Sequence, residues 1–376
     1  MARRHLYIFA LAALAVPAAI GSAHAGGLEA NGYNWDLLFD PATYAGKGTL
    51  THVTINHETQ NSGFGPGTVA TSSNRVYYNM GFKADFLDTA SCLISVQNPW
   101  GTGIDRDPAY ARDTGQVVRE RLTSNDIGAT CAFGFDVGPG LASIIGGVSA
   151  QQLNYEARLA PPFPGPIRME NLSLDGSGFG WRLGAAYEVP EIALRVSAIY
   201  NAAIDYELEG TVYGNVLPKV GATADLTMPQ SFEVKAQTGI APRWLALGSV
   251  KWVDWSAIDE LTVNNSIRPV GTTLAYEDGW SVSAGIAHVL TEELTVLGSL
   301  NWDKGTSQRN SDGVLMAGNQ SDRYGVSLGA AYRPTANFEL SGGVSYSLIS
   351  ADSNARGESW DTGNVLAFSI SAKASF

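Results

Sequence analysis

The sequence predicts an all-β fold, a transmembrane antiparallel β-barrel of about 14 strands. Three observations support this prediction. The chain starts with an export signal, alternating polar and apolar segments recur along its length, and the last segment ends on an aromatic residue at the apolar parity.

The first 25 residues have the order of a secretory signal peptide. A basic start at Met1-Ala-Arg-Arg4 precedes an apolar run over 6–20 and the small-residue site Ser22-Ala-His-Ala25. We expect cleavage before Gly26, with a retained helix as the alternative. The full sequence carries 36 acidic against 24 basic side chains, which argues against nucleic acid as a partner.

Residues 26–47 show no clean alternation and are rich in turn-formers such as Asn31-Gly32 and Asp40-Pro41. A barrel of this size needs either a water-filled lumen or a plug, and this stretch is the one available as a plug. The predicted organisation is therefore a signal peptide at 1–25, an N-terminal plug at 26–47 and a barrel at 48–376.

Alternating segments follow from residue 49 onward. We expect strands at 49–60, 73–86, 89–98, 115–136, 140–158, 177–188, 191–208, 224–240, 243–260, 272–289, 293–305, 321–333, 336–350 and 362–376. Tight turns such as 136–140 and 333–336 alternate with longer polar links such as 98–114 and 305–320. Short turns at one end and long loops at the other are typical of bacterial outer-membrane barrels.

The C-terminal segment gives the clearest alternation. Side chains on a strand alternate between its two faces. One parity carries Leu366, Phe368, Ile370, Ala372, Ala374 and Phe376, and the other carries Ser369, Ser371, Lys373 and Ser375. We expect this last strand to close the barrel against the strand that starts near Thr49, with Phe376 facing lipid.

An ordered set of motifs resembles the FadL/TodX family of outer-membrane transporters of hydrophobic compounds. The motifs are Leu37-Leu-Phe-Asp-Pro-Ala42, Gly178-Phe-Gly-Trp-Arg-Leu-Gly184, Leu226-Thr-Met-Pro-Gln230, Ala241-Pro-Arg-Trp244, Trp252-Val-Asp-Trp-Ser256 and Asn301-Trp-Asp303. They span nearly the whole mature chain. The chain departs from the family pattern at Asp40, where the family usually has Asn, and in loops that are shorter than those of the fatty-acid prototype.

The resemblance implies a location in the outer membrane of a Gram-negative bacterium. It also implies a hatch that closes the lumen, onto which Gly32, Asp40, Pro41 and Ala42 are carried over. A fatty acid or other hydrophobic compound would be captured at extracellular loops, pass into a lumenal pocket and leave sideways through a gap at a kinked strand. We find no energy-coupling motif and expect passive uptake, no cofactor and no enzymatic activity.

The C-terminal strand pattern and the resemblance together predict the partners. These are a hydrophobic small molecule, outer-membrane lipid and the outer-membrane assembly machinery, for which Phe376 is the candidate recognition signal. Family precedent favours a monomer.

Two groups of residues are candidates for ligand contact. Arg182, Arg195, Lys235 and Lys251 fall at inward positions of neighbouring strands, where a carboxylate ligand would need a cation. The alternative, which we favour for any one of them, is pairing with lumenal acids such as Glu233 and Asp254. The aromatic residues near predicted loop ends could form a hydrophobic capture surface or equally an interface belt; they are Tyr110, Phe163 and Phe179.

Other chemistry finds little support. Cys92 and Cys131 are too few for a disulfide framework or a metal site, so we expect two buried thiols, with a cross-strand disulfide as the alternative. The acidic loop residues 105, 107 and 113 lack calcium-site spacing, and no metal is expected. No nucleophile motif accompanies the histidines.

Two other functions remain open at this point. A general diffusion porin for small polar solutes would lack a plug and would usually carry a long inward-folding loop. A surface adhesin or receptor would use the barrel only as a platform, with its outer loops making the attachment.

Overall fold

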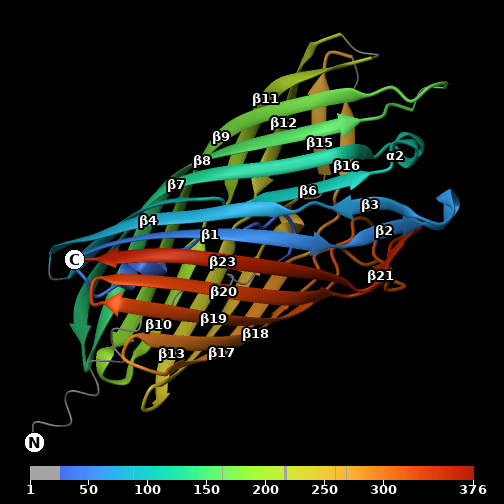
Figure 1. Ribbon diagram of the computed structural model, residues 1–376. Helices are drawn as coiled ribbons and strands as arrows, with labels where there is room; N and C mark the ends of the chain where they lie inside the picture. Colours follow the sequence, from blue (N-terminus) through green and yellow to red (C-terminus); the bar gives the residue numbers. More distant parts are fainter. Residues whose placement is uncertain (1–25, 88, 163, 216–217, 259, 268) are drawn as a thin grey trace, which may run out of the picture.

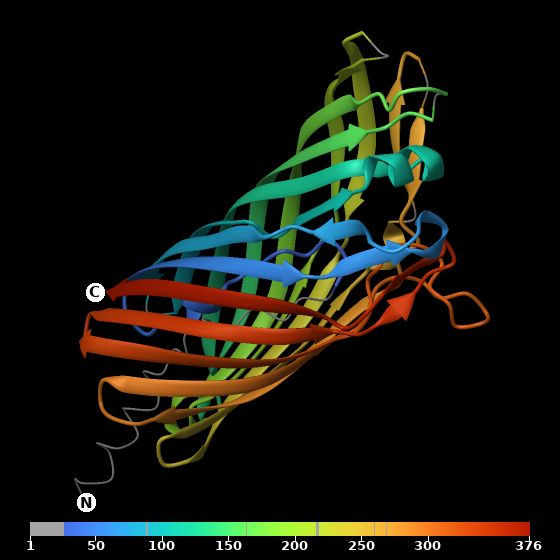
Figure 2. The same ribbon diagram turned by 45° about the vertical axis from the view of Figure 1, so that its right-hand side comes forward.

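The computed structural model describes residues 26–87, 89–162, 164–215, 218–258, 260–267 and 269–376. The predicted signal peptide, 1–25, and Phe163 lie outside the described residues. Strands form one closed antiparallel barrel (Figures 1 and 2). Among the described residues, no helix is long and apolar enough to cross a membrane.

The strand segments are β1 (Tyr44–Asn56), β2 (Glu58–Asn61), β3 (Thr68–Ser72), β4 (Arg75–Leu87), β5 (Ala90–Gln97), β6 (Gly101–Arg106), β7 (Val117–Val137), β8 (Gly140–Leu159), β9 (Glu170–Val189), β10 (Leu194–Asn201), β11 (Ile204–Gly214), β12 (Val220–Met228), β13 (Ser231–Ala241), β14 (Trp244–Val253), β15 (Glu260–Asn265), β16 (Val270–Thr273), β17 (Gly279–Val289), β18 (Leu294–Asp303), β19 (Arg323–Thr335), β20 (Phe338–Ile349), β21 (Asp352–Ser353), β22 (Glu358–Trp360) and β23 (Gly363–Ser375). Because several barrel strands are interrupted, these segments make up 14 strands of the closed barrel, as predicted.

The helical segments are short. They are η1 (Asp36–Phe39), η2 (Ser62–Phe64), α2 (Pro108–Thr114), η3 (Pro190–Ile192) and η4 (Trp255–Ala257). α2 lies in a loop at the end of the barrel where the long connections gather (Figure 1). We call this the long-loop end and the opposite one the short-turn end.

The barrel closes between its first and last strands, as the C-terminal pattern predicts. β1 pairs with β23 from Ala45↔Ser375 to Asn56↔Asn364. The apolar parity of β23 points outward, with Phe368, Ile370 and Phe376 exposed by 51%, 65% and 72%. Ser371 and Lys373, on the other parity, are buried. The predicted two faces of this strand are therefore confirmed.

Several predicted strand bounds are wrong. Proline interrupts two of the barrel strands, because it has no backbone N–H to donate to the neighbouring strand. The predicted strand 224–240 is split at Pro229 into β12 and β13, and the third barrel strand continues beyond Pro99 as β6. The predicted strand 191–208 is likewise split into β10 and β11, and 243–260 into β14 and β15. β1 starts at Tyr44 instead of residue 48 or 49.

The two cysteines correct a second expectation. Cys92 and Cys131 face each other across β5 and β7 and form a disulfide, so the expectation of two separate thiols is wrong. They share a parity with Ile94 and Phe133, which are 58% and 60% exposed, so the bond lies on the outer face of the barrel. Direct cross-strand opposition brings the two Cβ atoms within bonding reach.

Candidate ligand pathway in the barrel lumen

The described chain begins inside the barrel with residues 26–40, which we call the lumenal segment (Figure 2). Trp35 and Leu38 are 1% and 3% exposed. Together with Leu28 and Tyr33 they pack against inward-facing apolar side chains from β7 to β15. The segment thus fills one side of the lumen.

A cavity of about 560 Å³ lies on the long-loop side of the lumenal segment. Its floor includes Leu28, and its apolar wall comes from strands on several sides of the barrel. The apolar lining residues are Leu28, Ile104, Val117, Leu122, Tyr155, Leu226, Leu261, Leu274 and Tyr276. Polar and charged side chains, among them Thr59, Arg106, Gln116 and Glu120, line the rest of the cavity. We call this space the apolar pocket after its apolar wall.

The apolar pocket exists because the strand pattern reverses toward the long-loop end. On β11, Tyr206 and Leu208 point inward and are almost fully buried, while Glu207 and Glu209 point outward and are exposed. A lipid-facing strand would carry its apolar residues on the outer face. This part of β11 therefore projects beyond the membrane and turns its apolar face to the lumen.

The apolar pocket is lined by three basic side chains, Arg75, Arg106 and Arg356, and by two acidic ones, Glu120 and Glu358. Arg75 donates to the carbonyl oxygens of Gly101 and Gly103 at 3.2 and 3.1 Å, and Arg106 donates to that of Val117 at 3.3 Å. The Nε atoms of Arg75 and Arg106 are buried and have no hydrogen-bond partner among the described residues. Unused donors beside an apolar wall suit an anionic headgroup.

The four predicted lumenal cations all contact the lumenal segment. Lys251 pairs with Glu29, Lys235 lies 3.2 Å from Asp36, Arg182 lies over the Tyr33 ring at 5.0 Å and Arg195 lies over the Phe39 ring at 4.7 Å. Lys235 is also 3.9 Å from Glu233. Asp254 instead accepts hydrogen bonds from Gln230 and Ser256.

The contacts of the lumenal segment with Lys235 and Arg195 keep the Asp36 carboxylate ionised. Burial raises the pKa of Asp36, but the nearby Lys235 and Arg195 lower it further than burial raises it. The carboxylate therefore stays ionised beside Lys235, and the ion pair ties η1 to β13.

Glycine at position 32 is required by its surroundings. Gly32 has φ +61°, and an added Cβ would lie 2.7 Å from Glu29 Oε1 and 2.9 Å from Lys251 Nζ. A larger residue would therefore strain the backbone and push apart the ion pair between Glu29 and Lys251.

Asp40 is the residue at which the sequence departs from the pattern that it otherwise resembles, where Asn is expected. Its Oδ1 atom accepts from the Ala42 amide at 3.0 Å, which closes the turn around Pro41, and its Oδ2 atom accepts from Lys373 at 2.8 Å. Lys83 donates to the carbonyl oxygens of Asp40 and Ala42. Asn could make the turn, but only Asp adds an ion pair to the last strand.

A seam in the barrel wall lies beside the lumenal segment. Backbone pairing between β4 and β5 stops at Asn79↔Gln97, and pairing between β3 and β6 starts at Ser72↔Ile104. Between these points Asn98 accepts from the Tyr78 amide at 3.1 Å and donates to the Ser124 carbonyl oxygen at 2.7 Å. Side chains replace the missing ladder.

The lumenal segment completes this seam from the inside. The Ala30 amide donates to the Pro99 carbonyl oxygen and the Gly101 amide donates to that of Leu28, both at 2.9 Å. A movement of residues 28–30 would therefore free backbone groups at the break between β5 and β6.

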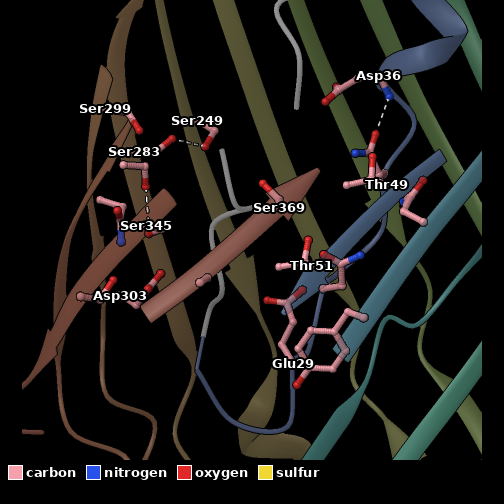
Figure 3. A pocket seen from close by; sticks show the side chains of 18 of the residues that line it. Glu29, Asp36, Thr49, Thr51, Ser249, Ser283, Ser299, Asp303, Ser345 and Ser369 are labelled. Carbon is pink, nitrogen blue, oxygen red and sulfur yellow. Dashed lines mark hydrogen bonds between the residues drawn. The ribbon is translucent and has the colours of Figure 1, made fainter. Parts of the chain in front are cut away.

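A second cavity, of about 250 Å³, lies between the lumenal segment and the opposite wall (Figure 3). Its wall bears hydroxyl groups from β14, β17, β18, β19, β20, β23 and β1, together with apolar side chains such as Val53, Leu247 and Leu297. Glu29 and Asp36 line it from the lumenal segment. Arg75 lines both cavities, so they adjoin at this residue.

The predicted capture aromatics lie in two different settings. Tyr110 on α2 is fully buried, and burial together with a hydrogen bond to Glu358 raises its pKa to about 12. Its ring is thus not presented at the surface, although Phe64 packs on it and is 40% exposed. Phe179 is 83% exposed and faces outward beside Trp181, where the outer face of β9 changes from polar to apolar.

Sequence reasoning missed Arg75, Arg106 and the apolar wall of the pocket. The alternation of Tyr206 and Leu208 with Glu207 and Glu209 was a usable signal. It identifies a strand whose charged face cannot contact lipid. The two arginines carried no such signal, because their unused donors depend on distant strands.

These features define a class of protein, a membrane-spanning β-barrel whose lumen is occupied by its own N-terminal segment. Residues 75–376 match the family described as outer membrane protein transport protein (OMPP1/FadL/TodX), and the chain belongs to this family. It is an outer-membrane protein with a multi-pass β-barrel, so the long-loop end is extracellular and the short-turn end periplasmic.

Named relatives and solved structures agree with this assignment. The chain is similar to the long-chain fatty acid transport protein of Escherichia coli K12, with 23% identity over 74% of this chain and 64% of that protein. It is also similar to outer membrane protein P1 of Haemophilus influenzae, with 27% identity over 45% of this chain and 38% of that protein. The chain thus spans less than two thirds of the length of these relatives.

The fold is similar to two solved barrels. A FadL homologue from Pseudomonas aeruginosa has a TM-score of 0.73 at 17% identity, over 91% of this chain and 92% of that one. The toluene transporter TodX of Pseudomonas putida has a TM-score of 0.67 at 16% identity, over 95% and 99%.

Proposed function

We propose that this protein takes up long-chain fatty acids or other hydrophobic compounds by passive diffusion across the outer membrane. The observation that carries the proposal is the apolar pocket. A lumen wall of leucine and tyrosine favours binding of a hydrophobic ligand, whereas a porin for polar solutes needs polar groups there. Its volume of about 560 Å³ lies within the range of about 300–1,000 Å³ typical of small-molecule sites.

In this proposal the predicted plug, residues 26–47, keeps the lumen closed below the apolar pocket. A ligand that displaces Leu28 would weaken the contacts of residues 28–30 with Pro99 and Gly101. The seam between β4 and β6 would then loosen, and the ligand would leave sideways into the membrane. This route avoids the polar periplasmic half of the lumen, where an apolar chain would lose favourable burial at roughly 25 cal/mol per Å².

Uptake of labelled oleate and toluene tests the function in a strain that lacks its own transporter. The protein is expected to raise uptake of at least one of the two, and no gain for either would contradict the proposal. Neutralising Arg75 and Arg106 to Gln should lower oleate uptake more than toluene uptake, since only oleate carries a carboxylate.

The earlier candidates Arg195 and Lys251 provide the comparison. Because both hold the lumenal segment, neutralising them to Gln is expected to change oleate and toluene uptake by similar factors. A selective loss of oleate uptake in this second pair would assign the carboxylate to Arg195 and Lys251 instead.

The lateral route has a separate test. Cysteines introduced as Tyr78→Cys and Asn98→Cys can be joined by a bifunctional thiol reagent, while the native cysteines are already paired with each other. Crosslinking should lower uptake relative to the untreated double variant. Equal uptake before and after crosslinking would place the exit elsewhere.

A further inference from the structure

The barrel wall at the long-loop end is an open sheet, although the wall within the membrane is closed. Its segments pair in the order β21, β22, β2, β3, β6, β7, β8, β9, β11, β12, β15 and β16. Among the described residues, β21 pairs with β22 alone and β16 pairs with β15 alone. We call this sheet the crown, and the space between its two edges the crown slot.

One arginine side chain bridges the crown slot. Arg356 lies in the turn between β21 and β22, and its Nη2 atom donates to the carbonyl oxygen of Thr273, the last residue of β16, at 3.3 Å. Both residues are exposed. Among the side chains that the structure describes, this is the one hydrogen bond between the two edges of the crown.

The crown slot leads into the apolar pocket. Gly271, Thr273 and Leu274 line the pocket on the side of β16, and Arg356 and Glu358 line it on the side of β22. Three of the five exposed lining residues stand at the slot, namely Gly271, Thr273 and Arg356. The other two are Thr114 and Gly115, which follow the helical turns of α2. The slot is therefore the main place where the pocket meets the outside.

The two edges of the crown slot are held with different firmness. The turn that carries Arg356 is fixed by Asn61, which donates to the Arg356 carbonyl oxygen at 3.2 Å, and by Asn354, which accepts from the Arg356 amide at 3.0 Å. On the other side, β16 is paired only with β15 among the described residues, and β15 pairs with β12 over just 222–224. β16 is thus the edge that opens more easily, because a short ladder is a weakly held unit.

The bond across the slot can be exchanged for a stronger one. A guanidinium can donate two parallel hydrogen bonds to a carboxylate, whereas Arg356 donates one to the neutral Thr273 carbonyl oxygen. In the described chain no carboxylate lies within ion-pair distance of Arg356, unlike Arg309 at the same end of the barrel, which pairs with Asp352 at 2.6 Å. Glu260, which lies opposite Thr273 on β15, accepts from Thr262.

We propose that ligands enter the apolar pocket sideways through the crown slot, and that Arg356 keeps the slot closed until a ligand carboxylate takes its guanidinium from Thr273. The inference rests on the proposed uptake of hydrophobic compounds. It adds an entrance between β16 and β22 and a preference for ligands that carry an anionic headgroup on an apolar chain.

Crosslinking the two edges tests the entrance. Cysteines introduced as Thr273→Cys and Arg356→Cys can be joined by a short bifunctional thiol reagent, which should lower oleate and toluene uptake severalfold relative to the untreated double variant. The matched control is Gln60→Cys with Ser359→Cys, two exposed positions that already oppose each other in β2 and β22. Joining this control pair should leave uptake unchanged. Unchanged uptake after the slot itself is crosslinked would overturn the entrance.

Charge neutralisation tests the role of Arg356. Arg356→Gln should raise the oleate concentration needed for half-maximal uptake severalfold and should leave toluene uptake equal or higher, since toluene has no carboxylate. Arg309→Gln removes an exposed arginine that does not line the pocket and should change neither. An equal loss of oleate and toluene uptake in Arg356→Gln, or the same oleate effect in Arg309→Gln, would overturn the role of Arg356. Gel mobility that shifts on boiling verifies that each variant forms a barrel.

The entrance and the proposed function fail separately. Absence of oleate and toluene uptake by the unmodified protein would contradict the proposed function itself. Uptake that persists at full rate with the slot crosslinked would overturn the entrance while the proposed function stands.

Discussion

His57 shows how a single side chain can be forced into one protonation state. It lies between β1 and β2 and is 6% exposed, with its ring edge-on to Trp360 at 5.9 Å. β1 already exceeds the roughly 9–11 residues that a transmembrane strand needs, so His57 lies beyond the membrane. Burial, and then the positive charge of Arg323, lower its pKa from 6.5 to about 4.

Acid should therefore loosen the extracellular end of the barrel. Between pH 6.5 and pH 4 the opened form of this region takes up a proton that the folded form resists, so the free energy of opening falls as pH falls. The full shift corresponds to about 3 kcal/mol. Hydrogen exchange of backbone amides in 357–360, corrected for intrinsic rates, should show lower protection at pH 4.5 than at pH 7.

The variant His57→Phe supplies the control for this prediction. It keeps a ring against Trp360 but cannot titrate, so its protection should change little with pH. Equal pH dependence in both proteins would show that another group is responsible.

Residue parity was predictable and residue pairing was not. Phe368 and Ser371 take the faces that a period of two predicts, because alternation is a local property of the strand. The ion pair between Glu29 and Lys251 joins residues 222 positions apart, and nothing local to either residue indicates it. The ion pair between Asp40 and Lys373, 333 positions apart, could not be predicted for the same reason.

The third strand of the barrel consists of β5 and β6, and these two segments differ in how they are held to their neighbours. β5 is joined to β7 by backbone pairing and by the disulfide between Cys92 and Cys131. Beyond Pro99, β6 loses its pairing with β4 and depends on Asn98 and Arg75. The disulfide therefore holds β5 to β7, whereas β6 is joined to β4, among the described residues, only through the side-chain hydrogen bonds of Arg75.

Removing the disulfide should lower the free energy of unfolding by about 2–4 kcal/mol, because the bond closes a loop of 39 positions in the unfolded chain. Urea unfolding with and without reductant measures the effect. The double variant Cys92→Ser with Cys131→Ser should match the reduced protein and show no response to reductant. An unchanged midpoint in the reduced protein would contradict the expectation.

Strand number was predictable at this scale, but strand continuity was not. Fourteen alternating segments are visible because each crosses the membrane with one apolar face. The start of β9 at Glu170 was missed because Leu172 and Leu174 turn their apolar side chains to the lumen. The shorter predicted strand placed Phe179 at a loop, whereas it lies in the middle of β9.

For the molecule as a whole, the outer face must match lipid and the inner face must match water or ligand. Leu328 lies in the middle of β19, is 60% exposed and faces outward. Leu328→Arg should cost about 2–4 kcal/mol, as charged residues do near the bilayer midplane. Thr51→Arg, on the lumen-facing parity of β1, should cost less.

The fraction of protein that keeps its folded gel mobility in increasing urea compares these two variants. A larger loss for Thr51→Arg than for Leu328→Arg would mean that the assigned faces are reversed.

The contacts of the lumenal segment also set an order of events during folding. Asp40 binds Lys373, 333 positions away, and the Gly27 amide binds Thr306, 279 positions away. Contacts this distant form late, because the chain between them must first be brought together. The N-terminal residues can contact nearer strands first, at Lys83 and Pro99, and complete their contacts only when the final strands are in place. The last strand therefore both closes the barrel wall against β1 and binds the beginning of the chain through Lys373 and Asp40.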